Sequence, residues 1–147
     1  MEKKVVSDLL KNKNAIFVCK HKHHTTMAQH NQLGKIGEQH AVDFLERKGY
    51  RILDQNWRAG HKEIDIVALH DGKVVFIEVK TRSTDVFGNP EEFVDDKKIK
   101  RILSAADTYM KMHRFSARVR FDIISVLIQY DKIDIRHIED AFDILPE

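Results

Sequence analysis

The fold is decided by one stretch, Lys62-Glu-Ile-Asp-Ile-Val-Ala-Leu-His-Asp-Gly-Lys-Val-Val-Phe-Ile-Glu-Val-Lys80. It holds two apolar runs joined by Asp71-Gly72, and Asp-Gly between alternating hydrophobic residues is the strongest short-range signal for a β-hairpin. A two-residue turn fixes the register, because each step away from the turn pairs the next two residues. We therefore expect Val67 to face Phe76 across the hairpin.

The same register brings charged side chains together at the end of the hairpin away from the turn. Asp65 is predicted to face Glu78, and Glu63 to face Lys80. Directly opposed residues have Cβ atoms about 5 Å apart, and like charges in that position destabilise a sheet. A divalent cation such as Mg²⁺, which prefers carboxylate oxygens, would offset the repulsion between the two acids. The alternative is that Glu63 and Lys80 form an ion pair while Asp65 and Glu78 reach solvent at a strand end.

Both faces of the hairpin are apolar behind these charges. The face shared with Asp65 and Glu78 carries Val67, Leu69, Val74 and Phe76. The opposite face is predicted to carry Ile64, Ile66, Val75, Ile77 and Val79. Strands that are apolar on both faces are usually central in a sheet and covered on both sides. The charged cluster is therefore expected at one end of a buried hairpin.

A third carboxylate belongs to a predicted helix at residues 34–48, which Gly49 would end. Glu38 follows i, i+3, i+4, i+7 spacing with the apolar residues Ala41, Val42 and Leu45, so it lies on the stripe that should face the core. Two interpretations stay open. Glu38 is either an acid favoured by the helix N-terminal dipole or a third carboxylate aimed at the hairpin cluster.

The rest of the chain adds one helix, three strands and a loop. Their predicted ranges are an edge-type strand at 50–57, a loop at 81–92, a helix at 94–112, a strand at 118–130 and its hairpin partner at 132–138. Trp57 is expected to belong to the core. Asp122 has no evident chemical role, and an ion pair with Arg120 or Arg118 is the simplest interpretation.

Cations crowd the first half of the helix predicted at 94–112. They are Lys97, Lys98, Lys100 and Arg101. Positive charge near a helix N-terminus opposes the helix dipole, so a polyanionic partner would help to explain it. The alternative is a solvated face balanced by Asp95 and Asp96.

Composition sets the broad class. The 147 residues are 42% hydrophobic and 33% charged with a net charge of +2, which fits one globular domain and does not by itself indicate nucleic acid.

One cysteine, Cys19, excludes an internal disulfide and fits a reducing compartment. No apolar run approaches the roughly 20 residues of a membrane helix, so we expect a cytoplasmic protein without a membrane partner. Residues 1–30 are predicted to be an N-terminal arm, disordered or upstream of a natural start at Met27, and residues 31–147 the functional domain.

The order of these pieces resembles a known nuclease core. This order is similar to the core of the PD-(D/E)XK nuclease superfamily, which has a helix, a strand, a hairpin, a helix and a strand. The hairpin here carries Asp65 and then Glu78-Val-Lys80. The closer resemblance is to the YraN-like family within it, carried by Gly37-Glu-Gln-His-Ala41, Asn56-Trp-Arg58, Glu63-Ile-Asp65 and Glu78-Val-Lys-Thr-Arg82. Lys62 replaces a frequent Gly, and Ile64 replaces the Pro of the superfamily name. The resemblance implies an α/β fold with a restriction-endonuclease-like core, a central mixed β-sheet flanked by helices on both faces.

The resemblance also implies a function. It implies a Mg²⁺- or Mn²⁺-dependent endonuclease acting on nucleic acid, which we expect to be DNA, including branched or repair and recombination intermediates. The implied metal ligands are Asp65, Glu78, the Val79 carbonyl and Glu38. The implied catalytic residues are Asp65, Glu78, Lys80, Glu38 and Glu63, with Lys80 acting on the attacking water and Glu63 orienting Lys80. The residues expected to contact phosphates are Arg82, Lys97 and Arg58. A homodimer is an option that no apolar stripe in the sequence requires.

Two other functions stay beside this one. The first is a nucleic-acid-binding module of the same fold with little or no catalysis, and the second is a protein-interaction scaffold whose carboxylates are structural. The nuclease and a metal-dependent binding module both predict that Mg²⁺ or Mn²⁺ stabilises the protein and that Asp65→Ala or Glu78→Ala abolishes this effect. The scaffold predicts no such stabilisation.

Overall fold

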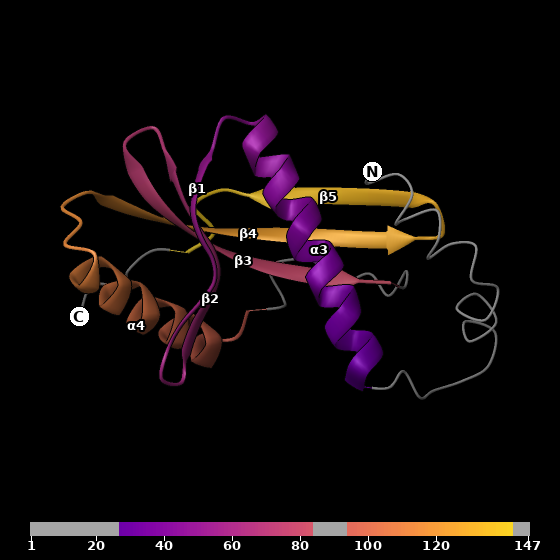
Figure 1. Ribbon diagram of the computed structural model, residues 1–147, viewed down its shortest axis with the longest axis horizontal. Helices are drawn as coiled ribbons and strands as arrows, with labels where there is room; N and C mark the ends of the chain where they lie inside the picture. The colour runs from indigo at the N-terminus through magenta and orange to yellow at the C-terminus, as the bar shows by residue number, and fades with distance from the viewer. Residues whose placement is uncertain (1–26, 84–93, 143–147) are drawn as a thin grey trace.

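The computed structural model describes residues 27–83 and 94–142, which form a five-stranded sheet with a helix on each face (Figure 1). The helices are α3 (Met27–Arg47) and α4 (Asp96–Met112). The strands are β1 (Arg51–Ala59), β2 (Lys62–His70), β3 (Lys73–Arg82), β4 (Arg118–Gln129) and β5 (Lys132–Ile138). They lie in the sheet in chain order, with β3 and β4 parallel and the other neighbours antiparallel. The predicted α/β class with a mixed sheet covered on both faces is confirmed.

The two helices cover opposite faces because successive residues of β3 point to opposite sides of the sheet. Val75 and Ile77 join the apolar cluster beneath α3, whereas Val74 and Phe76 join the cluster beneath α4. All four side chains are at most 1% exposed. The predicted burial of β3 on both faces is therefore correct. Trp57 is partly buried against the cluster beneath α4, as expected of a core residue.

Most predicted element bounds lie within a few residues of the observed ones. The exception is the first helix, which was predicted at 34–48 but begins at Met27. Residues 28–32 are mostly polar and give no apolar periodicity, so the sequence pattern could not extend the helix toward its start. Residues 1–26 of the predicted arm and most of the predicted loop lie outside the described residues, and the predicted domain boundary after residue 30 falls inside α3.

The hairpin turn has the conformation that Asp-Gly favours. Asp71 and Gly72 have φ values of 48° and 70°, as a type I′ turn requires at both central positions. The strands leave this turn in the predicted register, with Val67 opposite Phe76. The tight turn therefore fixes the pairing of β2 and β3.

The ladder between β2 and β3 ends earlier than the sequence predicted. Its last pair is Ile66 with Ile77, and beyond this pair β2 stays with β1 while β3 continues along β4 (Figure 1). Asp65 and Glu78 are therefore not a backbone-paired couple, and neither are Glu63 and Lys80. The prediction that these residues directly oppose each other was wrong, because a register fixed at the turn cannot reveal where two strands separate.

The alternation along β2 is also interrupted at Asp65. Ile66 packs in one cluster with Val75 and Ile77, as the predicted shared face requires, but Ile64 packs in the cluster beneath α4. In the neighbouring strand, Asn56 has a φ of 52°, and it lies between the pairs Gln55–Ile66 and Trp57–Ile64. Asn tolerates this left-handed conformation better than most residues. The irregular backbone explains why Ile64 was placed on the wrong face.

Helix α3 approaches the end of β3 very closely. A Cβ atom built on Gly37 would lie 1.8 Å from the Thr81 Oγ1 atom, far inside van der Waals contact. Gly37 is buried, and the next residue of the helix is Glu38. The absence of a side chain at Gly37 therefore lets α3 hold Glu38 close to the end of β3.

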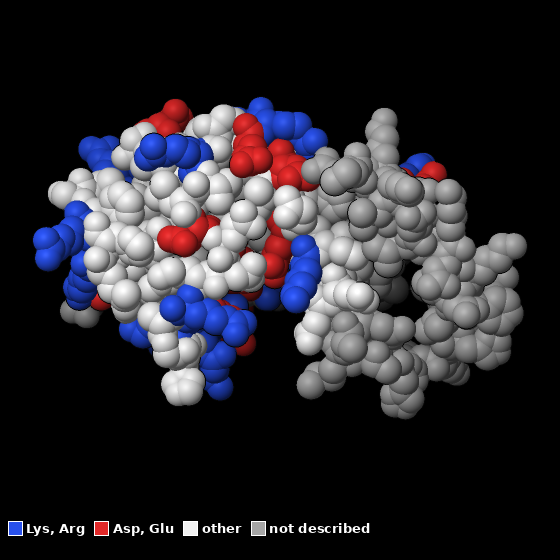
Figure 2. All heavy atoms as spheres, in the orientation of Figure 1, with Lys and Arg blue, Asp and Glu red and all other residues white. Residues whose placement is uncertain are grey.

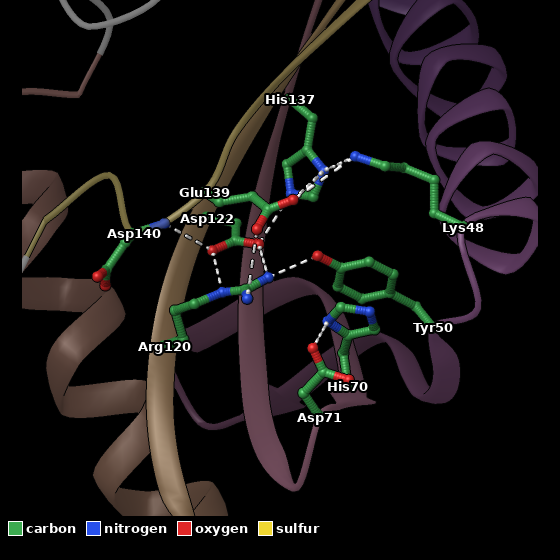
Figure 3. A network of polar contacts seen from close by, with 9 residues as sticks. All are labelled: Lys48, Tyr50, His70, Asp71, Arg120, Asp122, His137, Glu139 and Asp140. Carbon is green, nitrogen blue, oxygen red and sulfur yellow. Dashed lines mark hydrogen bonds and ion pairs between the residues drawn. The ribbon is translucent and has the colours of Figure 1, made fainter.

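A buried polar network ties β4 to β5 and to the end of α3 (Figure 3). Arg120 donates to both oxygens of Asp122, at 2.9 and 2.7 Å, which confirms the predicted pairing. Arg120 also donates to the Tyr50 hydroxyl at 2.6 Å, and His137 Nε2 lies 2.8 Å from Asp122. The hydrogen bonds from His137, Arg120 and the Asp140 backbone outweigh the effect of burial and lower the pKa of Asp122. The sequence did not predict the His137 contact.

Candidate active site

The candidate site lies where β2 and β3 separate. The Asp65 carboxylate occupies the place of the missing ladder contact, because its Oδ2 atom accepts a hydrogen bond from the Val79 backbone N–H at 2.8 Å. This bond fixes Asp65 beside the start of the Glu78-Val-Lys80 segment. The sequence pattern predicted this proximity, although it predicted it through direct strand pairing.

Glu78 is the buried acid of the site, with a side chain that is 5% exposed. Its Oε1 atom lies 3.0 Å from Lys80 Nζ and 3.1 Å from Lys98 Nζ. A buried carboxylate is costly unless it is paired and hydrogen-bonded. The two ammonium groups supply that pairing, so the alternative in which Glu78 simply reaches solvent is wrong.

Lys98 is the site residue that the sequence analysis did not single out. It comes from the first turn of α4, where its backbone N–H donates to the helix-capping Asp95 carboxylate at 2.7 Å. A signal was available, because Lys98 precedes the buried residues Ile102 and Ala105 by four and seven positions. The same spacing argument that selected Glu38 would have placed Lys98 on the buried face of its helix.

Asp65 is the acid of the site whose pKa is raised. Burial, the Glu78 carboxylate and, more weakly, the Glu38 carboxylate raise the pKa of Asp65 to about 7. The Val79 N–H bond and Lys98 act in the opposite direction but do not cancel the effect. Burial is thus the main reason that the ionised form of Asp65 is disfavoured, and the Glu78 carboxylate adds to it.

Other predicted site residues lie at different distances from this centre. Glu38 is half-buried in α3 and is close enough to influence Asp65. Glu63 contacts Arg58, its cross-strand partner, with 3.4 Å between the Oε2 and Nη2 atoms, whereas Lys80 contacts Glu78. The predicted contact between Glu63 and Lys80 is therefore not present.

The three residues predicted to contact phosphates come from three different elements. Arg58 is exposed at the end of β1, and Lys97 is exposed on the first turn of α4. Arg82 is half-buried in the last position of β3. The structure shows where these cations lie and does not test what they bind.

The donor set can be compared with what a divalent cation needs. Mg²⁺ is commonly held by one or two carboxylates together with water and substrate phosphates. The carboxylates of Asp65 and Glu78 are donors of this kind, and burial together with the Glu78 carboxylate raises the pKa of Asp65. Within residues 27–83 and 94–142, however, no three His, Cys, Asp or Glu side chains converge on one metal position. The role of Glu38 as a metal ligand, directly or through water, therefore stays a prediction.

The fold and this arrangement define an α/β protein of the restriction-endonuclease-like, PD-(D/E)XK type. A family model described as "Uncharacterised protein family UPF0102" matches residues 37–126, a range that contains Glu38, Asp65, Glu78, Lys80 and Lys98. The chain belongs to this family, which is the YraN-like family indicated by its motifs.

Related proteins support the same assignment. A UPF0102 protein of Bacteroides thetaiotaomicron is 53% identical over 116 residues, which cover 79% of this chain and 96% of that protein. UPF0102 protein BF0634 of Bacteroides fragilis is 50% identical with the same coverage. UPF0102 protein FP2501 of Flavobacterium psychrophilum is 45% identical and is covered to 98%. These names state the family and no activity. In the described part of the chain, no helix is both long and apolar enough to cross a membrane.

Proposed function

We propose that this protein is a metal-dependent nuclease that hydrolyses phosphodiester bonds in nucleic acid, with DNA as the first substrate to test. The observation that carries the proposal is the meeting of the Asp65 and Glu78 carboxylates with Lys80 where β2 and β3 separate. Membership of the UPF0102 family supports it, because that family belongs to the PD-(D/E)XK-like superfamily.

Each residue of the site has a distinct part in the proposal. Asp65, Glu78 and the Val79 carbonyl would hold Mg²⁺ or Mn²⁺, which when bound polarises a phosphoryl oxygen and lowers the pKa of water. The Lys80 amine, fixed by Glu78, would orient the attacking water or neutralise charge on the phosphate. Lys98 places a second ammonium group at the same carboxylate and would bind the substrate phosphate once Glu78 turns to the ion.

Three outer cations complete the proposal. Arg82, Lys97 and Arg58 would contact phosphates on either side of the reacting bond. Such contacts position the backbone of the nucleic acid and carry no sequence information. Glu38 would complete the metal shell directly or through water, and its carboxylate also contributes to the raised pKa of Asp65.

A panel of labelled substrates tests the activity. Single-stranded, duplex, flapped and branched DNA, and RNA of the same sequences, are incubated with the full chain and either Mn²⁺, Mg²⁺ or EDTA. We expect metal-dependent cleavage of at least one substrate, and a fall of about 100-fold or more in the rate for Lys80→Ala, because a positioned proton-transfer or charge-stabilising group contributes about that much. Lys132→Ala, which removes an exposed lysine of β5, is the matched control and is expected to leave the rate within about twofold of wild type.

A second candidate function is a nucleic-acid-binding module of the same fold without catalysis. The pairing of Glu78 with two ammonium groups favours it, because that carboxylate already has partners without an ion. The same panel separates the two candidates. If wild-type protein cuts nothing with either metal, and Glu78→Gln binds DNA as tightly as wild type, the nuclease proposal fails and the binding module remains.

A further inference from the structure

A basic cleft of about 530 Å³ adjoins the candidate site. One wall is the start of β2 with Lys62, and the other is the first half of α4 with Lys98, Lys100 and Arg101. Lys and Arg side chains gather in Figure 2 at the lower edge of the view, where Figure 1 shows the start of α4 beside the turn between β1 and β2. Four cations on facing walls create a positive potential suited to a polyanion.

The Lys62 charge of the cleft is held in place by neighbouring residues of α4. Lys62 Nζ donates to Thr108 Oγ1 at 2.7 Å and to the Ser104 carbonyl at 3.4 Å, which fixes its ammonium group against α4. One carboxylate, Glu63, also lines the cleft, but it is paired with Arg58. The lining therefore keeps an excess of positive charge.

Lys98 connects this cleft to the candidate site. Its side chain lines the cleft, and its Nζ atom lies 3.1 Å from the buried Glu78 carboxylate. A chain of phosphates with one phosphate at Glu78 could therefore continue past Lys98 toward Lys100 and Arg101.

The lining of the cleft favours one strand over two. Its volume lies within the range of about 300–1,000 Å³ typical of small-ligand pockets. Ile102 adds an apolar surface to the lining, against which a base or sugar can pack. An unpaired base can reach this apolar surface, whereas the bases of a duplex are paired and stacked on one another.

We propose that this cleft binds the sugar–phosphate backbone of a single-stranded segment of nucleic acid next to the bond that the candidate site would cut. The proposal rests on the proposed function in one respect, that the bound strand leads to the bond to be cut. The binding itself can be measured without cleavage. It adds Lys62, Lys100 and Arg101 to the substrate contacts and assigns a preference for single-stranded or unpaired regions.

Binding is tested by fluorescence anisotropy with short labelled oligonucleotides in EDTA over a series of salt concentrations. The arms are single-stranded DNA, single-stranded RNA and duplex DNA, and the protein is the full chain. The test variant is Lys100→Ala/Arg101→Ala, and the control Lys132→Ala/Arg136→Ala removes the same charge from exposed positions of β5. For single strands we expect binding about tenfold weaker in the test variant and a salt slope that falls by about 1.4, from 0.7 per phosphate contact. The control is expected to stay within about twofold of wild type, and duplex binding is expected to change less than single-strand binding.

Failure of the cleft and failure of the nuclease proposal give different results. If wild-type protein cuts nucleic acid but the test variant binds single strands as wild type does, the cleft inference is wrong and the nuclease proposal stands. Equal losses in the test and control variants, or an equal loss on duplex DNA, also overturn the inference. If the test variant loses single-strand binding but no substrate is cut, the cleft is supported and the nuclease proposal fails.

Discussion

Glu78 and Asp65 show how two neighbouring acids acquire different properties. Glu78 is 5% exposed and is paired with Lys80 and Lys98, whereas Asp65 has a backbone N–H as its partner. Burial and the charges of nearby carboxylates therefore raise the pKa of Asp65 to about 7. The pair offers a divalent cation one carboxylate that contacts two amines and one that, among residues 27–83 and 94–142, is hydrogen-bonded to a backbone N–H.

The pKa of Asp65 predicts a pH-dependent gain in stability from Asp65→Asn. An acid whose pKa is raised on folding, here from an ordinary value near 4, destabilises the folded state as pH rises from about 4 to 7. Asn keeps an acceptor for the Val79 N–H but carries no charge. At pH 8 in EDTA we expect the free energy of unfolding of the variant to exceed that of wild type by a few kcal/mol, since each pKa unit corresponds to about 1.4 kcal/mol. At pH 4 we expect little difference.

The measurement is urea unfolding at both pH values. Asp107→Asn serves as the control, because Asp107 is an exposed acid that pairs with Lys111 on the surface of α4. A gain for Asp65→Asn that is the same at pH 4 and pH 8 would contradict the account.

Asp122 is expected to behave in the opposite way. Its pKa is lowered, so its ionised form stabilises the fold above the ordinary pKa of an Asp, and this contribution is lost as pH falls below about 4. Asp122→Asn weakens the contacts with buried Arg120 and His137, and breaking a buried pair costs about 3–5 kcal/mol. We expect a loss of that size in the free energy of unfolding at pH 7, measured by urea unfolding, and a smaller loss at pH 3. A loss below about 1 kcal/mol at pH 7, as for a surface pair, would show that the network is not structural.

At the scale of the elements, separation of β2 from β3 creates the site. Each strand keeps its other neighbour, so the sheet stays hydrogen-bonded while a space opens for the Asp65 carboxylate. Helix α3 closes over the end of β3 from one face, and α4 brings Lys98 from the other. The site therefore depends on how closely each helix approaches β3.

The close approach of α3 predicts opposite effects for two glycine substitutions in this helix. Gly37→Ala places a methyl group 1.8 Å from Thr81 Oγ1, so α3 must shift, and we expect a loss of about 1–3 kcal/mol in the free energy of unfolding. Gly34→Ala meets no atom within 4 Å and should gain about 0.5–1 kcal/mol from helix propensity. Thermal or urea unfolding of both variants measures the difference. Equal gains for both would mean that α3 does not contact Thr81 as described.

The sequence predicted the helices and strands better than it predicted the contacts between them. Alternation and the Asp71-Gly72 turn determine β2, β3 and their register, because both signals are local. The end of the ladder at Ile66 and Ile77 depends on competition between neighbours, which local patterns do not contain. For the same reason Asp65 and Glu78 were correctly brought together, whereas Glu63 was assigned to Lys80 although it contacts Arg58.

At the scale of the whole molecule, the charge that matters is local. A net charge of +2 gives no indication of a polyanion partner, but four cations of the cleft lie beside the candidate site. Their grouping could not be predicted, because Lys62 reaches α4 only when β1 and β2 fold toward that helix. Cytoplasmic location and a homodimer stay predictions from the sequence.

A Mn²⁺ titration followed by melting temperature shows whether Asp65 and Glu78 together bind a divalent ion. We predict that Mn²⁺ stabilises the wild-type protein progressively, by about 2.7 kcal/mol at a concentration 100 times the dissociation constant. Asp65→Asn and Glu78→Gln should abolish this gain, whereas Asp107→Asn should retain it. A wild-type melting temperature that does not respond to Mn²⁺, or a gain that both site variants retain in full, would contradict the account.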